Sequence, residues 1–128
     1  LDDAFAAIAA ARVAVNAEDA AARLEAVSTN GDVAEIYREM ASFKALTSAA
    51  SNYSLEDRRI GLEALAVPGK PLRLLAEEQL ALLDVEAGNT DDAIARLQRI
   101  IEDSETTAGL RQRASQLIVA LGGELDAG

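Results

Sequence analysis

The sequence predicts an all-α protein built from antiparallel helix pairs, and three observations support this prediction. Half of the 128 residues are apolar but only 3% are aromatic, so alanine and leucine must supply most of the core. The apolar residues recur every three or four positions, which is the period of a helix with one buried face. Both prolines lie within residues 68–71, so the rest of the chain is free of this helix breaker. At this length we expect a single domain, residues 1–128.

Seven helices are expected, each with one apolar stripe and with residues that start or stop helices at its ends. Asp32 is expected to cap the third helix, with Glu35 completing a capping box. Ser54, together with Asp57, is expected to open the fourth helix. The last helix is expected to end at Gly122. The predicted helices cover residues 2–15, 18–28, 32–50, 54–66, 71–87, 90–101 and 108–121.

The clearest helix pair lies in residues 71–101. Pro71 is expected at the first helical position, where its missing N–H would be unpaired in any case. Gly88 is expected to end this helix, because glycine readily adopts the left-handed conformation. Thr90 is expected to cap the next helix, whose first turn carries two aspartates that favour its positive end. Neither helix can bury its stripe alone, so the sequence points to packing and binding.

A short pattern recurs in the odd-numbered helices. An apolar residue and an arginine are followed by an alanine three residues later, at separations of 35 and 38 residues. Such a spacing, holding a helix, a turn and a second helix, is typical of a tetratricopeptide-like array, here a right-handed stack of pairs. A non-repetitive helical bundle is the alternative. The three copies are Tyr37-Arg38 with Ala41, Leu72-Arg73 with Ala76, and Leu110-Arg111 with Ala114; the expected units are residues 2–30, 32–67 and 71–105, with a capping helix at 108–121.

The unit at residues 73–106 resembles the tetratricopeptide consensus most closely. Its Leu80-Ala81 pair, its Gly88-Asn89 turn, and Ala93 and Leu97 on the second helix match consensus positions. The departures replace consensus Trp, Tyr, Ala and Pro with Glu77, Asp84, Ile100 and Glu105, respectively.

Nearly the whole chain also resembles one bacterial family, the tetratricopeptide-like periplasmic domain of the ancillary Sec translocon subunit and cell-division coordinator, in its alphaproteobacterial form. The resemblance is carried by YREMASFKAL (37–46), by residues 62–100 and by residues 106–122, and most specifically by AVPGKPLR at 66–73. It implies a periplasmic domain that assists protein export or envelope assembly and contacts the Sec translocon or periplasmic chaperones. It also implies an inner-membrane anchor in a segment not present in this chain.

Composition disfavours several classes of function. The net charge of −10 repels phosphate backbones and anionic lipids, so we expect no nucleic-acid or direct membrane binding. The chain has no His and no Cys, and no grouping of acid, base and nucleophile was found, so no enzyme activity, cofactor or metal is expected. The adjacent carboxylates Asp91 and Asp92 are better explained by helix capping than by a Mg²⁺ or Ca²⁺ site in the loop at residues 89–92.

The predicted function is a non-catalytic protein–protein interaction module whose concave groove receives a segment of another protein. A structural homo-oligomerisation domain, such as a homodimer without a peptide groove, is the alternative. The repeated arginines are expected to pair with neighbours such as Glu35, Glu39 or Glu77; a site for a peptide carboxylate is the competing hypothesis. Repeat geometry predicts that the groove is lined by Met40, Phe43, Thr47, Leu75, Glu78, Leu82 and Glu86, with plain core packing as the alternative for Met40 and Phe43.

Overall fold

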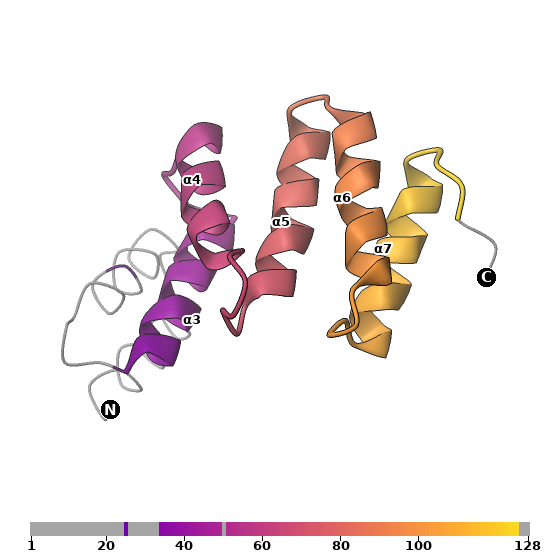
Figure 1. The fold of residues 1–128 in the computed structure, drawn as a ribbon. Coiled ribbons are helices and arrows are strands. Elements are labelled where there is room, and N and C mark those ends of the chain that lie inside the picture. Colours follow the sequence, from indigo (N-terminus) through magenta and orange to yellow (C-terminus); the bar gives the residue numbers. More distant parts are fainter. Residues whose placement is uncertain (1–24, 26–33, 50, 126–128) are drawn as a thin grey trace.

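The structure, a computed structural model, describes residues 25, 34–49 and 51–125, and this part of the chain is all-α (Figure 1). No strand occurs among these residues, so the predicted all-α class is confirmed for them. The predicted helices at 2–15 and 18–28, apart from Glu25, lie outside the described residues. The five described helices are α3 (Glu35–Thr47), α4 (Leu55–Leu65), α5 (Arg73–Glu86), α6 (Thr90–Glu102) and α7 (Ala108–Ala120).

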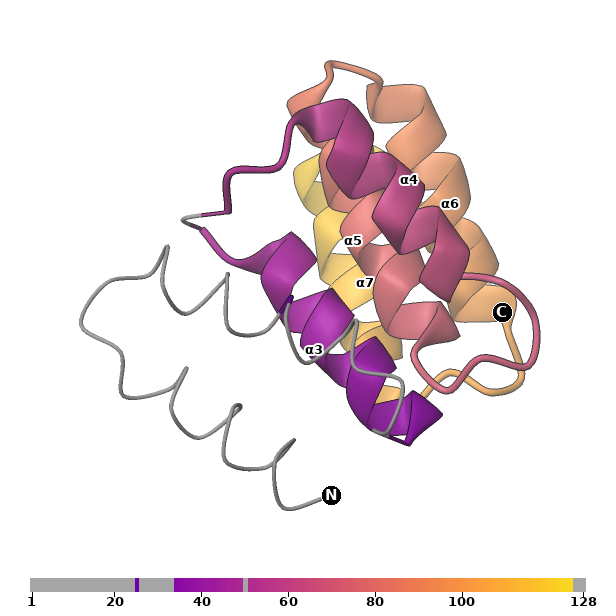
Figure 2. The same ribbon diagram turned by 90° about the vertical axis from the view of Figure 1, so that its left-hand side faces the viewer.

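The helices follow one another in space in the order in which they occur in the sequence. Each described helix packs against the next one along the chain. Figure 1 shows that α3, α5 and α7 run in one direction and that α4 and α6 run in the other, and Figure 2 shows the same row from its end. Within the described part of the chain, no helix is long and apolar enough to cross a membrane.

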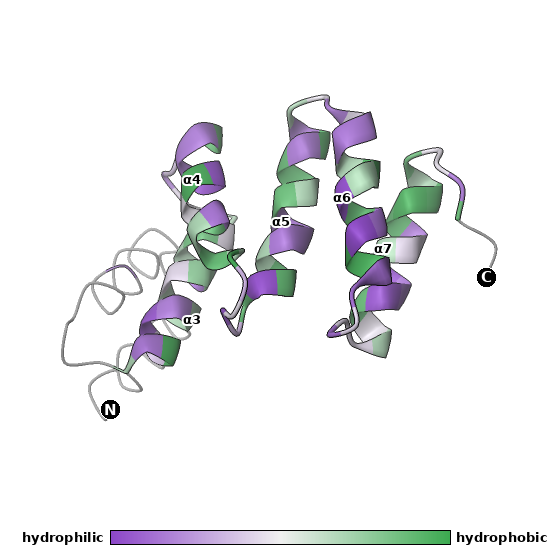
Figure 3. Ribbon diagram, viewed as in Figure 1, coloured by the Kyte–Doolittle hydropathy of each residue, from purple (hydrophilic) through white to green (hydrophobic). Residues whose placement is uncertain are grey.

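Two apolar clusters form the core, and α5 contributes to both. In Figure 3 hydrophobic and hydrophilic residues alternate around each helix, as expected for helices that bury one face. The first cluster joins α3, α4 and α5, and the second joins α5, α6 and α7. The buried members of the first are Leu46, Leu62, Leu65, Ala76, Leu80 and Leu83; those of the second are Ala81, Leu97, Ile100, Leu110, Ala114 and Ile118.

Buried positions recur at the spacing of the sequence pattern. The three motif alanines, Ala41, Ala76 and Ala114, are all 0% exposed. In the second helices of the pairs, Leu62 and Leu97 lie 35 residues apart and are 1% and 0% exposed. The small alanine side chains allow the helix backbones to approach closely at these points. The same register of packing is therefore used twice along the chain.

The start of α4 and the C-terminal ends of α5 and α7 lie where the sequence predicts them. The Ser54 hydroxyl accepts a hydrogen bond from the Asp57 N–H at 3.0 Å, as a helix cap should. Gly88 has a φ of 83°. Beyond it, the Asn89 N–H donates to the Asp84 carbonyl at 2.7 Å, which completes a Schellman motif. Gly122, with a φ of 88°, ends α7 in the same way.

The limits of α3 differ from the prediction of 32–50. The helix begins at Glu35, after the non-helical Ala34, which has no side chain able to cap it. Asp32, the expected cap, lies outside the described residues. At the other end the helix stops at Thr47, whose hydroxyl donates to the Phe43 carbonyl at 2.8 Å, and Ser48 already has an extended backbone.

The starts of α5 and α6 also differ from the prediction. Pro71 is not the first helical residue. It follows Lys70 in a turn closed by a hydrogen bond from the Arg73 N–H to the Lys70 carbonyl at 3.2 Å, and α5 begins only at Arg73. Thr90 is not a cap, because it is the first residue of α6, and the cap position belongs to Asn89, whose side chain makes no capping hydrogen bond. The two aspartates do lie in the first turn of α6.

Candidate binding surface

Three of the seven predicted groove residues are exposed apolar side chains. Met40 on α3 is 36% exposed, and Leu75 and Leu82 on α5 are 37% and 41% exposed. Leu75 and Leu82 lie seven residues apart, which places them on the same side of α5, two turns from each other. Large apolar side chains at this exposure are available to a partner.

The other four predicted groove residues have partners within the chain. Phe43 is half-buried and packs against the first core cluster. The Thr47 hydroxyl is bonded to the backbone of α3. The carboxylates of Glu78 and Glu86 bond to arginines of α7 and α4. The three exposed apolar residues, Met40, Leu75 and Leu82, are called the apolar face below.

All five charged residues of α5 form ion pairs with other segments of the chain. Two of the ion pairs join α5 to α4, and one joins it to α7. Two more join α5 to Arg96 of α6. Arg73, the first residue of α5, pairs with the α6–α7 loop. Charge on this central helix is therefore balanced locally, although the whole chain carries −10. The distances are 2.8 Å for Glu77–Arg96, 2.9 Å for Glu78–Arg113, 2.9 Å for Asp84–Arg59, 3.3 Å for Asp84–Arg96, 2.9 Å for Glu86–Arg58, and 2.9 and 2.6 Å for Arg73 with Asp103 and Glu105.

Asp84 is the most deeply buried of these carboxylates, at 3% exposure. It forms ion pairs with Arg59 of α4 and with Arg96 of α6, so it joins the two helices that flank α5. In the sequence, this position differs from the consensus only in carrying Asp in place of tyrosine. A buried position that carries Asp, with unassigned arginines on both neighbouring helices, is the signal that could have revealed this network.

Of the repeated arginines, Arg73 and Arg111 hold the α6–α7 loop. Arg73 bonds to Asp103 and Glu105, and not to Glu77 as expected, because Glu77 is engaged by Arg96. Arg111 donates from Nε to the Ile101 carbonyl in the last turn of α6 at 3.2 Å, and from Nη2 to the Thr106 carbonyl of the loop at 3.5 Å. Because both guanidinium groups bond to other residues of the chain, the structure gives no support to a peptide-carboxylate site at Arg73 or Arg111.

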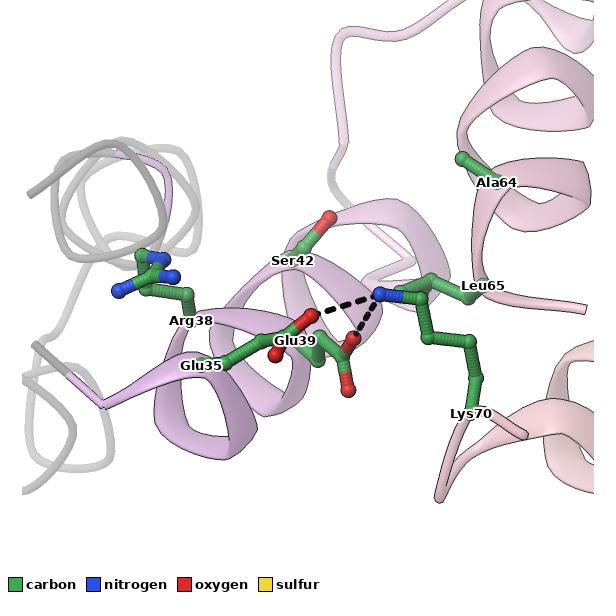
Figure 4. Close-up of a pocket in the computed structure, with 7 residues that line it drawn as sticks. All are labelled: Glu35, Arg38, Glu39, Ser42, Ala64, Leu65 and Lys70. Atoms are coloured by element: carbon green, nitrogen blue, oxygen red, sulfur yellow. Dashed lines mark hydrogen bonds and ion pairs between the residues drawn. The ribbon is translucent and has the colours of Figure 1, made fainter. Parts of the chain in front are cut away.

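Four pockets lie elsewhere on the described part of the chain. The one in Figure 4, of about 290 Å³, lies between α3, the end of α4 and Lys70. Another, of about 150 Å³, lies between α5 and α6, and a third of about 430 Å³ lies over Asp84. The fourth, of about 390 Å³, is lined by residues 88–92. None of these four is lined by the seven predicted groove residues.

The described residues contain no group of three or more His, Cys, Asp or Glu side chains placed to hold a metal ion. The loop at 89–92, considered above for Mg²⁺ or Ca²⁺, is included in that statement. Comparison of the chain with protein families, with curated proteins and with solved structures gave no match in any of the three.

Proposed function

We propose that this chain is a non-catalytic protein–protein interaction module, a tetratricopeptide-like right-handed stack of helix pairs whose apolar face receives a segment of another protein. The observation that carries the proposal is the match between Met40 and Leu75. These residues lie 35 positions apart, in equivalent places on α3 and α5, and they are exposed to 36% and 37%. A repeated array that exposes apolar side chains at equivalent positions presents a continuous surface to a partner.

Two of the pockets support the repeated architecture. The pocket between α3 and α4 and the pocket between α5 and α6 are lined by residues in corresponding positions. Equal spacing of pocket-lining residues is expected when one helix pair follows another by a constant rotation and shift. The corresponding residues are Arg38, Glu39, Ser42, Ala64 and Leu65 in the first pocket, and Arg73, Leu74, Glu77, Arg99 and Ile100 in the second, each 35 positions later.

The outer side of α7 supports its role as a capping helix. Val119 lies 38 residues after Ala81, which is fully buried against the second cluster, yet Val119 is 57% exposed. It is the one large hydrophobic residue of α7 that is strongly exposed, and the polar residues Arg111, Gln112, Arg113 and Gln116 of this helix are exposed as well. The outer face of α7 is therefore largely polar, as is usual for helices that close a stack.

For location and partner, the proposal follows the sequence resemblance. On that basis we propose a periplasmic domain that is held to the inner membrane by a segment outside this chain. It would assist export or envelope assembly by contacting the Sec translocon or periplasmic chaperones.

The test is capture of partners from an extract, with the chain as bait and mass spectrometry as the readout. Leu82→Asp should remove the partners that the parent captures, because it places a charge in the apolar face. Ile60→Asp is the matched control, since Ile60 is 57% exposed but lies on α4, outside that face. Equal capture by both variants would overturn the proposal.

Light scattering over a dilution series tests the alternative of self-association. A parent that dimerises tightly and a Leu82→Asp variant that is monomeric would assign the apolar face to a second copy of the chain. Phe43→Asp is a separate check. Because Phe43 packs against the core, this change is expected to lower the melting temperature by more than Leu82→Asp does.

A further inference from the structure

The pocket shown in Figure 4 contains a carboxylate whose capacity for hydrogen bonding is not used. Glu39 is 7% exposed, and its Oε1 bonds to Lys70 Nζ at 2.9 Å. Its other oxygen, Oε2, is buried and has no hydrogen-bond partner in the structure. A buried charged oxygen without a partner is costly, so this atom favours an added donor.

Two carboxylates of this pocket share one ammonium group. Lys70 also bonds to Glu35 at 2.7 Å, so that one ammonium group faces two carboxylates. These bonds raise the pKa of Lys70 and lower the pKa of Glu35, so this ammonium group and this carboxylate are both charged at neutral pH. Arg38 also lines the pocket, and its charge contributes to the lowered pKa of Glu35, but it extends from the other side of α3, away from Lys70 (Figure 4).

In the corresponding pocket of the next unit, both lining carboxylates are bonded to arginines. There Leu74 replaces Glu39, and Arg73 uses its guanidinium on Asp103 and Glu105. Glu77, at the position of Ser42, is bonded to Arg96. The unused carboxylate oxygen is therefore a particular feature of the first pocket and does not follow from the repeated fold.

We infer that the pocket between α3 and Lys70 binds a cation on an alkyl stem, an alkylguanidinium or alkylammonium group such as the end of an arginine or lysine side chain. The added donor bonds to Glu39, and its positive charge is attracted by the two carboxylates that share Lys70. The volume of about 290 Å³ accommodates such a group. A small rotation of the Glu39 carboxylate brings Oε2 toward the ligand, because the last torsion of a glutamate has no sharp preference.

The test is a titration of the whole ¹⁵N-labelled chain with N-acetyl-arginine amide and N-acetyl-lysine amide, followed by NMR. The inference expects saturable shifts of the amide signals of Ser42, Ala64 and Leu65 with at least one of them. N-acetyl-citrulline amide, which has nearly the shape of the arginine compound but no charge, should bind at least about tenfold more weakly. Agmatine has the same guanidinium group but no peptide unit. If it binds as tightly as the arginine compound, the site is supported and its ligand is assigned to small free cations of this kind.

Two variants complete the test. Glu39→Leu introduces the residue found at the corresponding place in the next unit, and Glu39→Gln serves if that variant does not fold. Either should weaken binding by about tenfold or more, whereas Glu63→Gln, which removes an exposed carboxylate outside the pocket, should leave it within about twofold. Unsaturable shifts in the parent, equal binding of the citrulline compound, or equal weakening by Glu63→Gln would each overturn the inference. The pocket shares no residue with the apolar face, so either proposal can fail without the other.

Discussion

The two apolar clusters on either side of α5 are built in the same register but are closed differently. After α4, Lys70 reaches back to Glu35 and Glu39 at the start of α3. Glu105, which follows α6 and lies 35 residues after Lys70, pairs with Arg73 at the start of α5. Here the acidic residue is in the loop and the basic residue is on the helix, the reverse of the first contact. Both parts therefore have an ion pair between loop and helix at this place, with the signs of charge reversed.

The two parts also differ at a pair of corresponding positions on α3 and α5. Leu74 of α5 packs against the second cluster. Its counterpart on α3 is Glu39, a buried carboxylate with one unused oxygen. Apolar packing at this point adds hydrophobic stabilisation, whereas a buried ion pair is offset by the cost of removing charges from water. We therefore expect the α3–α4 part to open more readily than the α5–α7 part.

The largest expected effect comes from removing one buried leucine from each cluster. Leu97→Ala and Leu62→Ala both empty a fully buried site and should each lower the free energy of unfolding by about 2–5 kcal/mol. Native-state hydrogen exchange should show that Leu62→Ala speeds exchange in α3 and α4 first, while Leu97→Ala affects all five described helices. Equal exchange patterns for the two variants would show that both clusters open as one unit.

A smaller effect is expected at Asp84, which joins the two parts by bonding to α4 and α6. Asp84→Asn should lower the free energy of unfolding by about 2–3 kcal/mol, because two arginines lose their buried carboxylate. The estimate is reduced because each arginine side chain is 20% exposed and Arg96 keeps Glu77. Glu86→Gln, which breaks an exposed pair, should cost less than about 1 kcal/mol in the same urea titration. A smaller loss for Asp84→Asn than for Glu86→Gln would contradict this ranking.

The smallest effect concerns the two contacts between loop and helix at low pH. Hydrogen bonds from Lys70 lower the pKa of Glu35, and those from Arg73 lower the pKa of Asp103. Because the folded values lie below the unfolded ones, their stabilisation is present at neutral pH and is lost as the pH falls below about 4. Lys70→Gln and Arg73→Gln should therefore lower the melting temperature at pH 7, and the difference from the parent should shrink toward pH 3. A difference that stays constant with pH would show that these bonds do not stabilise the fold.

Much of the fold follows from local sequence. The Schellman ends at Gly88 and Gly122 and the Ser54 cap were predicted from single residue types, because a left-handed backbone or a capping oxygen depends on few neighbours. The motif alanines were predicted from spacing, and all three are fully buried. The predicted starts of α5 and α6 were wrong by two residues and one residue, respectively. Proline and threonine are compatible both with the first turn of a helix and with the turn that precedes it, so neither residue fixes the start.

The candidate surface was predicted less completely. Periodicity placed Met40, Leu75 and Leu82 on one face, and the structure leaves all three exposed. It could not show that Glu78 and Glu86 are held by Arg113 and Arg58, since those partners lie about one repeat away in the sequence.

The sequence by itself determined the all-α class of the described residues, the approximate places of their helices and the repeated spacing of the motif alanines, because these depend on periodicity and on residues close together in the chain. Only the tertiary structure decided how the charges are paired, and therefore which carboxylate oxygen lacks a donor. The physical reason is distance. Apolar burial is set by the face of a helix, whereas an ion pair requires particular atoms of separate helices to meet within about 3 Å.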